Sequence, residues 1–184
     1  RDRSPSRGLG DVYKRQDYRR RTLEQVRTYI TPWGDEATAS LNDTFSRLAE
    51  TADESPVLKI ENREIQALRR AGGVVWFDFK TLCGGPRSQN DYLELANQFH
   101  TILLSDVPYM PVNKASEARR FTWLVDVLYD RRVKLILSAE VPAEALYTEG
   151  PLAHEFPRTV SRLEEMQSVE FLALERRTVD TGLT

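Results

Sequence analysis

The first half of the chain changes from a helical to a strand-like hydrophobic pattern. After Asp35, a potential helix cap, apolar residues recur every three or four positions and predict an amphipathic helix. That helix would bury Ala37, Leu41, Phe45 and Leu48. The stretch before it, residues 17–34, is expected to be extended or to form a turn. From Val57 to Phe79, β-branched and aromatic residues predict two or three strands, of which Val74–Phe79 is the clearest.

The second half alternates helices and strands. Ser88, followed three residues later by Asp91, has the spacing of a capping box. The helix that follows would bury Tyr92, Leu95, Ala96 and Phe99. A strand over Thr101–Asp106, a helix over Ser116–Asp130 and a strand in "VKLILS" come next. Nearly continuous apolar strands joined through a helix are typical of parallel neighbours covered on both faces, so the fold class is predicted to be α/β.

The end of the chain is predicted to hold two further helices, one in "PAEALYT" and one in "EFPRTVSRLEEMQS". Residues 175–184 are expected to be a frayed tail. The polar run "ETADESP" suggests a soft boundary near residue 53. A helical segment over residues 17–53 would then precede an α/β domain over residues 54–174.

The first sixteen residues have no apolar periodicity and are rich in Arg, Ser and Gly. Within them, "SRGLGDVYKRQ" resembles a translated sequencing adapter, so residues 1–16 are expected to be an artefactual or disordered head. This head carries a net charge of +3, which leaves −5 for the rest of a chain whose total is −2. The remainder is therefore mildly acidic.

Composition limits the classes of function. A chain of 184 residues with 40% hydrophobic and 29% charged residues is globular, and its net charge of −2 argues against a nucleic-acid partner. One cysteine excludes an internal disulfide, and only two histidines make a zinc site of Cys and His ligands an unfavourable interpretation. Without a bilayer-length apolar run, we expect a cytoplasmic protein, peripheral to a membrane at most.

Acidic residues follow the predicted parallel strands. Asp106 ends one strand and Glu140 follows its neighbour, where two carboxylates about 5 Å apart could bind Mg²⁺. An acid that caps the adjoining loop or helix explains Asp106 as well. An ATPase magnesium strand would carry glutamate directly after the aspartate, but Val107 stands there. A magnesium-dependent phosphoesterase would also need Asp78, which the pattern places inside its strand.

Arg158 and Arg162 lie four residues apart on one face of the predicted helix in "FPRTVSRLEEM". Pairing within the helix, of Arg158 with Glu155 or Arg162 with Glu165, is one explanation for them. The alternative is that a guanidinium reaches a phosphate or a neighbouring subunit, as an arginine finger does.

Three long segments share a family resemblance: "WFDFKTLCGGPRSQNDYLELANQFHTILLSDVP", "ARRFTWLVDVLYDRRVKLILSAEVPAEALYTEG" and "HEFPRTVSRLEEMQS". Together they resemble the C-terminal half of the ZapE and Afg-type family of AAA ATPases, over residues 17–174. The resemblance implies a P-loop ATPase-like fold, use of ATP and Mg²⁺, a homo-oligomer, and action on the tubulin-like division ring protein. The family's phosphate-binding loop has no counterpart here, so ATP and Mg²⁺ would be bound mainly by an upstream half.

The sequence supports three hypotheses about function. The first is the C-terminal part of a ZapE-like AAA ATPase that is inactive alone, with Arg158 and Arg162 communicating with a nucleotide as finger or sensor. The second is a non-enzymatic protein-interaction module. The third is a magnesium-dependent phosphoesterase that uses Asp106, Glu140 and Asp78.

Overall fold

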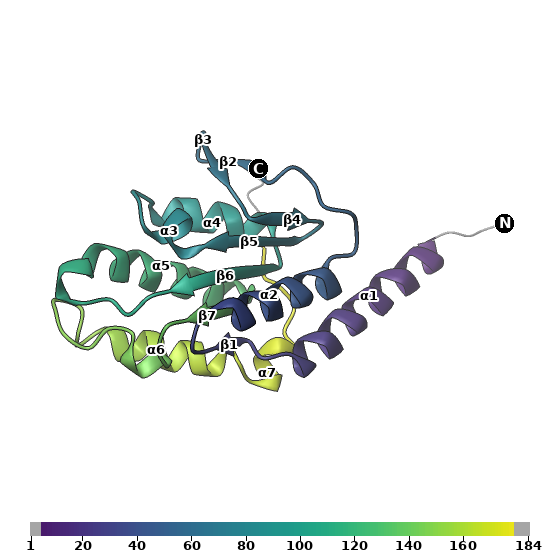
Figure 1. Cartoon of the computed structure of the whole chain (residues 1–184). Coiled ribbons are helices and arrows are strands. Elements are labelled where there is room, and N and C mark those ends of the chain that lie inside the picture. The colour runs from purple at the N-terminus through teal and green to yellow at the C-terminus, as the bar shows by residue number, and fades with distance from the viewer. Residues whose placement is uncertain (1–4, 179–184) are drawn as a thin grey trace.

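The computed structural model describes residues 5–178, which form one mostly parallel sheet with helices on both faces (Figure 1). The helices are α1 (Pro5–Gln25), α2 (Asp35–Leu48), α3 (Phe79–Cys83), α4 (Gln89–Gln98), α5 (Ala115–Arg131), α6 (Phe156–Glu165) and α7 (Val169–Leu172). The strands are β1 (Tyr29–Ile30), β2 (Val57–Ile60), β3 (Arg63–Gln66), β4 (Arg69–Ala71), β5 (Val74–Asp78), β6 (Thr101–Val107) and β7 (Lys134–Ala139). Short 3₁₀ turns are η1 (Val112–Lys114) and η2 (Ala143–Ala145).

The five-stranded sheet has the order β1-β7-β6-β5-β4. The pairs β1/β7, β7/β6 and β6/β5 are parallel, whereas β4 runs antiparallel to β5. A separate antiparallel hairpin, β2 with β3, turns at Glu61 and Asn62, and both of these have positive φ. The predicted α/β class and the parallel pairing of β6 with β7 are confirmed.

The sheet separates two layers of core. On one side α2 packs its apolar stripe against alternate residues of the central strands, among them Trp76, Leu103 and Ile136. The other side is covered by α4 and α5, which bury the intervening positions such as Phe77 and Leu104. Figure 1 shows α2 on one side of β6 and β7, with α4 and α5 on the other. Both faces of β6 and β7 are therefore dry, which explains their continuous apolar sequence.

The N-terminal region differs from the sequence-based expectation. Residues 17–25 belong to α1 rather than to an extended segment, so that prediction is wrong. The helix is mostly polar, and of the side chains described in it only Thr22 and Leu23 are buried, which left little apolar period to detect. The same helix continues back to Pro5, through part of the head that was expected to lack structure. That the head is a translated adapter stays a prediction.

The polar run near residue 53 is a loop, but the core continues across it. The stripe of α2 that was predicted from sequence is buried, and it lies on strands that come after the loop. Residues 17–53 and 54–174 therefore share one hydrophobic core.

Three local features of the fold differ in how well the sequence predicted them. The capping box of α4 is confirmed, since the backbone N–H of Ser88 donates to the Asp91 carboxylate at 3.0 Å. The segment "PAEALYT" forms only the short turn η2 rather than a helix, and α7 was not predicted. Residues 175–178 are held by hydrogen bonds from Arg176 and Arg177 rather than frayed, whereas 179–184 lie outside the described residues.

Candidate functional site

The carboxyl edge of the sheet holds the predicted acidic residues. At the end of β6 the register with β7 shifts between Leu104 and Val107, and Asp106 takes a left-handed conformation with φ of 65°. Its backbone N–H donates to the Ser138 hydroxyl of β7 at 2.9 Å. Burial, and then the nearby carboxylate of Asp78, raise the pKa of Asp106 above its ordinary value.

Asp78 lies within its strand, as expected, but as the last residue of β5, where it also caps α3. Its Oδ1 accepts the backbone N–H of Thr81 at 2.8 Å. Asp78 and Asp106 line one open hollow of about 500 Å³ together with Asp35, Lys80 and Trp33. The prediction from strand ends paired Asp106 with Glu140, whereas the structure places Asp106 in one hollow with Asp78.

Glu140 does not complete a magnesium site with them. Its carboxylate accepts the backbone N–H of Tyr109 at 2.9 Å, and Glu140 is not among the residues that line the hollow. Within residues 5–178, no group of three or more His, Cys, Asp or Glu side chains is arranged to hold a metal ion. The three acids that the phosphoesterase hypothesis requires are therefore not assembled, and we derive no chemistry through them.

Arg162 is held between two helices. Its guanidinium forms an ion pair with Asp126 of α5 at 2.6 Å and lies over the Tyr129 ring, 4.7 Å from the centroid. The Tyr129 hydroxyl in turn donates to Glu165 at 2.8 Å, which raises the Tyr129 pKa. The pairing of Arg162 with Glu165 inside α6 is therefore replaced by a link between helices. The Arg162 side chain is only 18% exposed.

Arg158 lies one turn earlier on α6 and is exposed. Among residues 5–178, no ion pair joins its side chain to a carboxylate, so pairing with Glu155 is not observed. The two arginines therefore differ in a way that the sequence did not show. Arg162 is bound to a neighbouring helix, whereas Arg158 is exposed to solvent.

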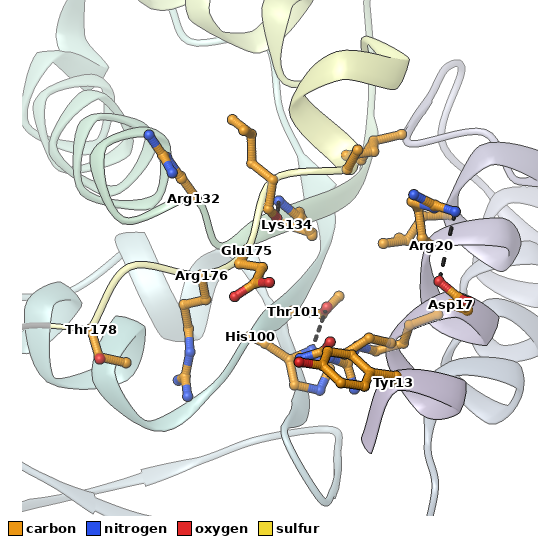
Figure 2. A pocket seen from close by; sticks show the side chains of 16 residues that line it. Tyr13, Asp17, Arg20, His100, Thr101, Arg132, Lys134, Glu175, Arg176 and Thr178 are labelled. Carbon is orange, nitrogen blue, oxygen red and sulfur yellow. Dashed lines mark hydrogen bonds and ion pairs between the residues drawn. The ribbon is translucent and has the colours of Figure 1, made fainter. Parts of the chain in front are cut away.

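The amino-terminal edge of the same sheet holds a basic cavity that sequence reasoning missed. It measures about 450 Å³ and lies between α1, the first residues of β6 and β7, and the segment after α7 (Figure 2). Its cationic lining residues are Arg19, Arg20, Arg132, Lys134 and Arg176. They come from three separate parts of the chain, so no local sequence pattern predicts that they lie together. The one available signal was a lysine at the first position of an apolar strand.

Burial and mutual repulsion shift the pKa values in this cavity. The pKa of Lys134 falls to about 8, first because the side chain is buried and then because Arg132 and Arg19 are near. The pKa of His100 falls to about 3 through burial and the charges of Arg19, Arg176 and Lys134. His100 is therefore neutral at physiological pH, and its Nδ1 lies 2.8 Å from the Thr101 hydroxyl.

The mostly parallel sheet with helices on both faces agrees with the P-loop ATPase-like class that the sequence suggested. Residues 11–175 match the family model described as AFG1-like ATPase, and the chain belongs to this family.

Among curated relatives, the chain is 44% identical over 160 residues to the cell division protein ZapE of Escherichia coli K12. It is also 36% identical over 138 residues to an uncharacterized protein of Schizosaccharomyces pombe, and 31% over 154 residues to the lactation elevated protein 1 homolog B of Danio rerio. These alignments cover 86%, 73% and 82% of this chain. They cover only 43%, 30% and 31% of the relatives, so the chain spans less than half of their length.

No solved structure matches the chain. Across the described part of the chain, no helix is both long and apolar enough to cross a membrane.

Proposed function

We propose that this chain is the C-terminal part of a ZapE-like AAA ATPase, which couples ATP hydrolysis to work on a partner protein in cell division. The observation that carries the proposal is the 44% identity to E. coli ZapE across 86% of the chain. ATP and Mg²⁺ would be held mainly by the upstream half, because the chain contains no phosphate-binding loop and its described residues offer no metal cluster.

In this proposal the chain's own residues communicate with a nucleotide rather than bind its phosphates as a loop would. Arg158 is the better candidate for a finger or sensor, since its guanidinium is exposed on α6. Arg162 acts as a positioning residue, because its pair with Asp126 fixes α6 against α5 and so sets where Arg158 points. To contact a phosphate directly, Arg162 would have to break its ion pair with Asp126 and move away from the Tyr129 ring.

The roles of the two arginines can be separated in a full-length family member that carries the equivalent residues. Arg158→Ala is expected to lower ATP turnover by about 10²-fold or more, as the loss of a charged transition-state contact does, with little change in thermal stability. Arg162→Ala is expected to lower the unfolding temperature as well, because Asp126 then loses its partner. The measurements are steady-state ATPase rates and thermal unfolding, with Arg119→Ala, an exposed arginine on α5, as control.

Unchanged turnover in the Arg158 variant would remove it from the finger or sensor role. Equal effects of both substitutions on turnover, without a loss of stability for Arg162, would contradict the division between contact and positioning residue. The present chain alone is expected to show no magnesium-dependent ATP hydrolysis, and measurable turnover would refute the claim that the nucleotide site lies elsewhere.

The partner that follows from the family is the tubulin-like division ring protein, with the full-length protein acting in the cytoplasm as a homo-oligomer, peripheral to the membrane at most. The non-enzymatic alternative gives a different result in one experiment. If the chain is an interaction module, it should bind the purified ring protein without ATP, whereas a dependence on the full-length, nucleotide-loaded protein favours the ATPase proposal.

A further inference from the structure

The basic cavity lies at the edge of the sheet opposite to the hollow of Asp78 and Asp106. Its floor is formed where β6 and β7 begin, and its walls come from α1 and from the segment that follows α7. Figure 2 shows Arg132, Lys134 and Arg176 on one side of the cavity and Arg20 on the other. All of its charged lining residues follow Gln16, whereas Tyr13 and Gln16, which also line it, belong to the suspected adapter sequence.

The positive charge in this cavity is not balanced by carboxylates. Arg20 pairs with Asp17 at 3.7 Å, and Arg19 pairs with Glu50 at 3.1 Å. Within residues 5–178, no ion pair is formed by the side chains of Arg132, Lys134 or Arg176. Glu175 also lines the cavity, but its single charge cannot neutralise three cations.

Lys134 is the most informative of these cations. Its side chain is only 6% exposed, yet its ammonium meets neutral acceptors, the carbonyl oxygens of Phe171 at 2.9 Å and Leu174 at 2.6 Å. An ammonium carries three donors, of which two meet these carbonyls, and the Phe171 ring lies beside it, with its centroid 4.6 Å from Nζ. Burying a cation without a counter-charge is costly, and the lowered pKa of Lys134 reflects that cost. A bound anion would supply the counter-charge and so remove this cost.

Arg132 also lines the cavity, and among residues 5–178 no carboxylate forms an ion pair with it. It ends α5 in a left-handed conformation, with φ of 59°, which turns the chain into β7. A planar guanidinium can donate two N–H groups to two oxygens of one phosphate. Among the described residues, no carboxylate takes up these N–H groups of Arg132. Arg176 lies on the same side of the cavity, in the segment after α7, and its Nη1 donates to the carbonyls of Ala96 and Asn97.

We propose that this cavity binds the phosphoryl group of an anionic ligand, with Arg132 and Lys134 as its main contacts and Arg176 as a third. Three cations that line one cavity match a doubly charged group better than a single carboxylate does. A volume of about 450 Å³ exceeds that of a bare phosphate, and Leu23 and Leu172 in the lining can contact an organic portion. The ligand is a soluble phosphorylated molecule or a phospholipid headgroup. The proposal does not depend on ATP hydrolysis by the family.

The test uses this 184-residue chain and inorganic pyrophosphate, titrated at pH 7 and low ionic strength by calorimetry. Arg132→Asn is the main variant, because asparagine tolerates the left-handed backbone while it removes the guanidinium. We expect pyrophosphate to bind about tenfold more weakly to this variant, as the loss of a charge-assisted hydrogen bond implies. The matched control is Arg119→Gln, which removes the same charge near the opposite end of α5 and should leave affinity unchanged.

A second arm distinguishes the two sources of the phosphoryl group. Vesicles of phosphatidylglycerol and phosphatidylcholine are compared with vesicles of phosphatidylcholine alone in a sedimentation assay. Binding of pyrophosphate that depends on Arg132 supports a soluble ligand, and binding only to the phosphatidylglycerol vesicles, again dependent on Arg132, supports a headgroup. Absence of both, or equal losses for Arg132→Asn and Arg119→Gln, would overturn the proposal.

A pH series adds a readout that a merely structural role for Lys134 would not produce. Sulfate is the suitable probe, since its charge is constant between pH 7 and 9. Because the pKa of unliganded Lys134 is about 8, its charge is present below that value and is lost above it, so sulfate affinity should fall across the range. A flat profile would exclude Lys134 as a contact. The charged or titratable groups that line the cavity with Lys134 are Tyr13, Asp17, Arg19 and Arg20 of α1, His100, Arg132, Glu175 and Arg176.

Discussion

Asp106 shows how a single residue can serve the fold at a place where sequence suggests chemistry. It stands at the irregular end of β6 in a left-handed conformation, which aspartate and asparagine tolerate better than most residues. Its backbone N–H is satisfied by the Ser138 hydroxyl of the next strand. Its carboxylate, however, is close enough to Asp78 for the two charges to repel.

Replacing Asp106 tests both statements. Asp106→Asn is expected to unfold at a higher urea concentration than the wild type at pH 7, because it keeps the backbone conformation and removes the repulsion. Asp106→Val should lower the free energy of unfolding by about 1–3 kcal/mol, since a β-branched residue is strained at positive φ.

The pH dependence of these variants has a definite sign. The Asp106 pKa is raised in the folded state, so the wild type loses stability as pH rises from the ordinary aspartate value through the raised one, and Asp106→Asn lacks this loss. Urea unfolding at several pH values measures the difference. An Asn variant less stable than the wild type at pH 7 would contradict the argument.

At this scale, sequence placed acids at neighbouring strand ends but paired Asp106 with Glu140 rather than with Asp78, and it missed what tertiary packing pairs. The proximity of Asp78 and Asp106 follows from parallel strands that end at one edge. The partner of Arg162, Asp126, lies 36 residues away on another helix, and no spacing rule within α6 could reveal it.

At the scale of elements, the hairpin β2–β3 is fastened to the start of α4. Asp91 is 2% exposed and accepts hydrogen bonds from the Ser88 backbone and, at 3.0 Å, from Arg63 of β3. The carboxylate of Glu94 on the same helix accepts the backbone N–H of Glu61 in the hairpin turn. One capping box therefore also anchors a hairpin.

Asp91→Ala is expected to lower the free energy of unfolding by about 1–3 kcal/mol, because it removes the helix cap and leaves the Arg63 guanidinium without its carboxylate. Asp43→Ala, at an exposed position of α2, should change stability by no more than about 0.5 kcal/mol. Chemical denaturation compares the two. Similar midpoints for both variants would show that the hairpin is held by its apolar contacts instead.

Local signals explain which elements could be predicted. The start of α4 is specified by residues three positions apart, so its box was found from sequence. Of the side chains described in α1, only Thr22 and Leu23 are buried, and a helix without an apolar stripe gives no period to detect. The two-residue strand β1 is too short to show alternation, and its place in the sheet is set wholly by β7.

For the molecule as a whole, the segment after α7 ties the ends of several elements together. Arg176 donates to two carbonyls at the end of α4, and the Arg177 backbone N–H donates to the carbonyl of Arg131 at the end of α5. Lys134 at the start of β7 adds its bond to Leu174. The basic guanidinium of Arg176 also suits the negative end of a helix dipole.

A chain that ends at Leu172 should therefore lose these four long-range hydrogen bonds and, with them, about 3–4 kcal/mol of unfolding free energy, at about 1 kcal/mol for each bond. Arg176→Ala removes two of them and should cost about half as much. Urea unfolding of the shortened chain, the point variant and the full chain measures this series. A shortened chain with unchanged stability would show that the segment only rests on the surface.

The strand order has a consequence for how the chain is made. At one edge of the sheet, Ile30 pairs with Ser138, a residue 108 positions later in the chain. On a ribosome, β1 emerges long before its neighbour β7 has been synthesised. The apolar side of α2 likewise remains uncovered until β5, β6 and then β7 emerge. When contacts between segments far apart in the sequence form late, folding is slow and apolar surface stays exposed for longer. Early chaperone contacts on nascent chains should therefore concentrate on residues 35–48.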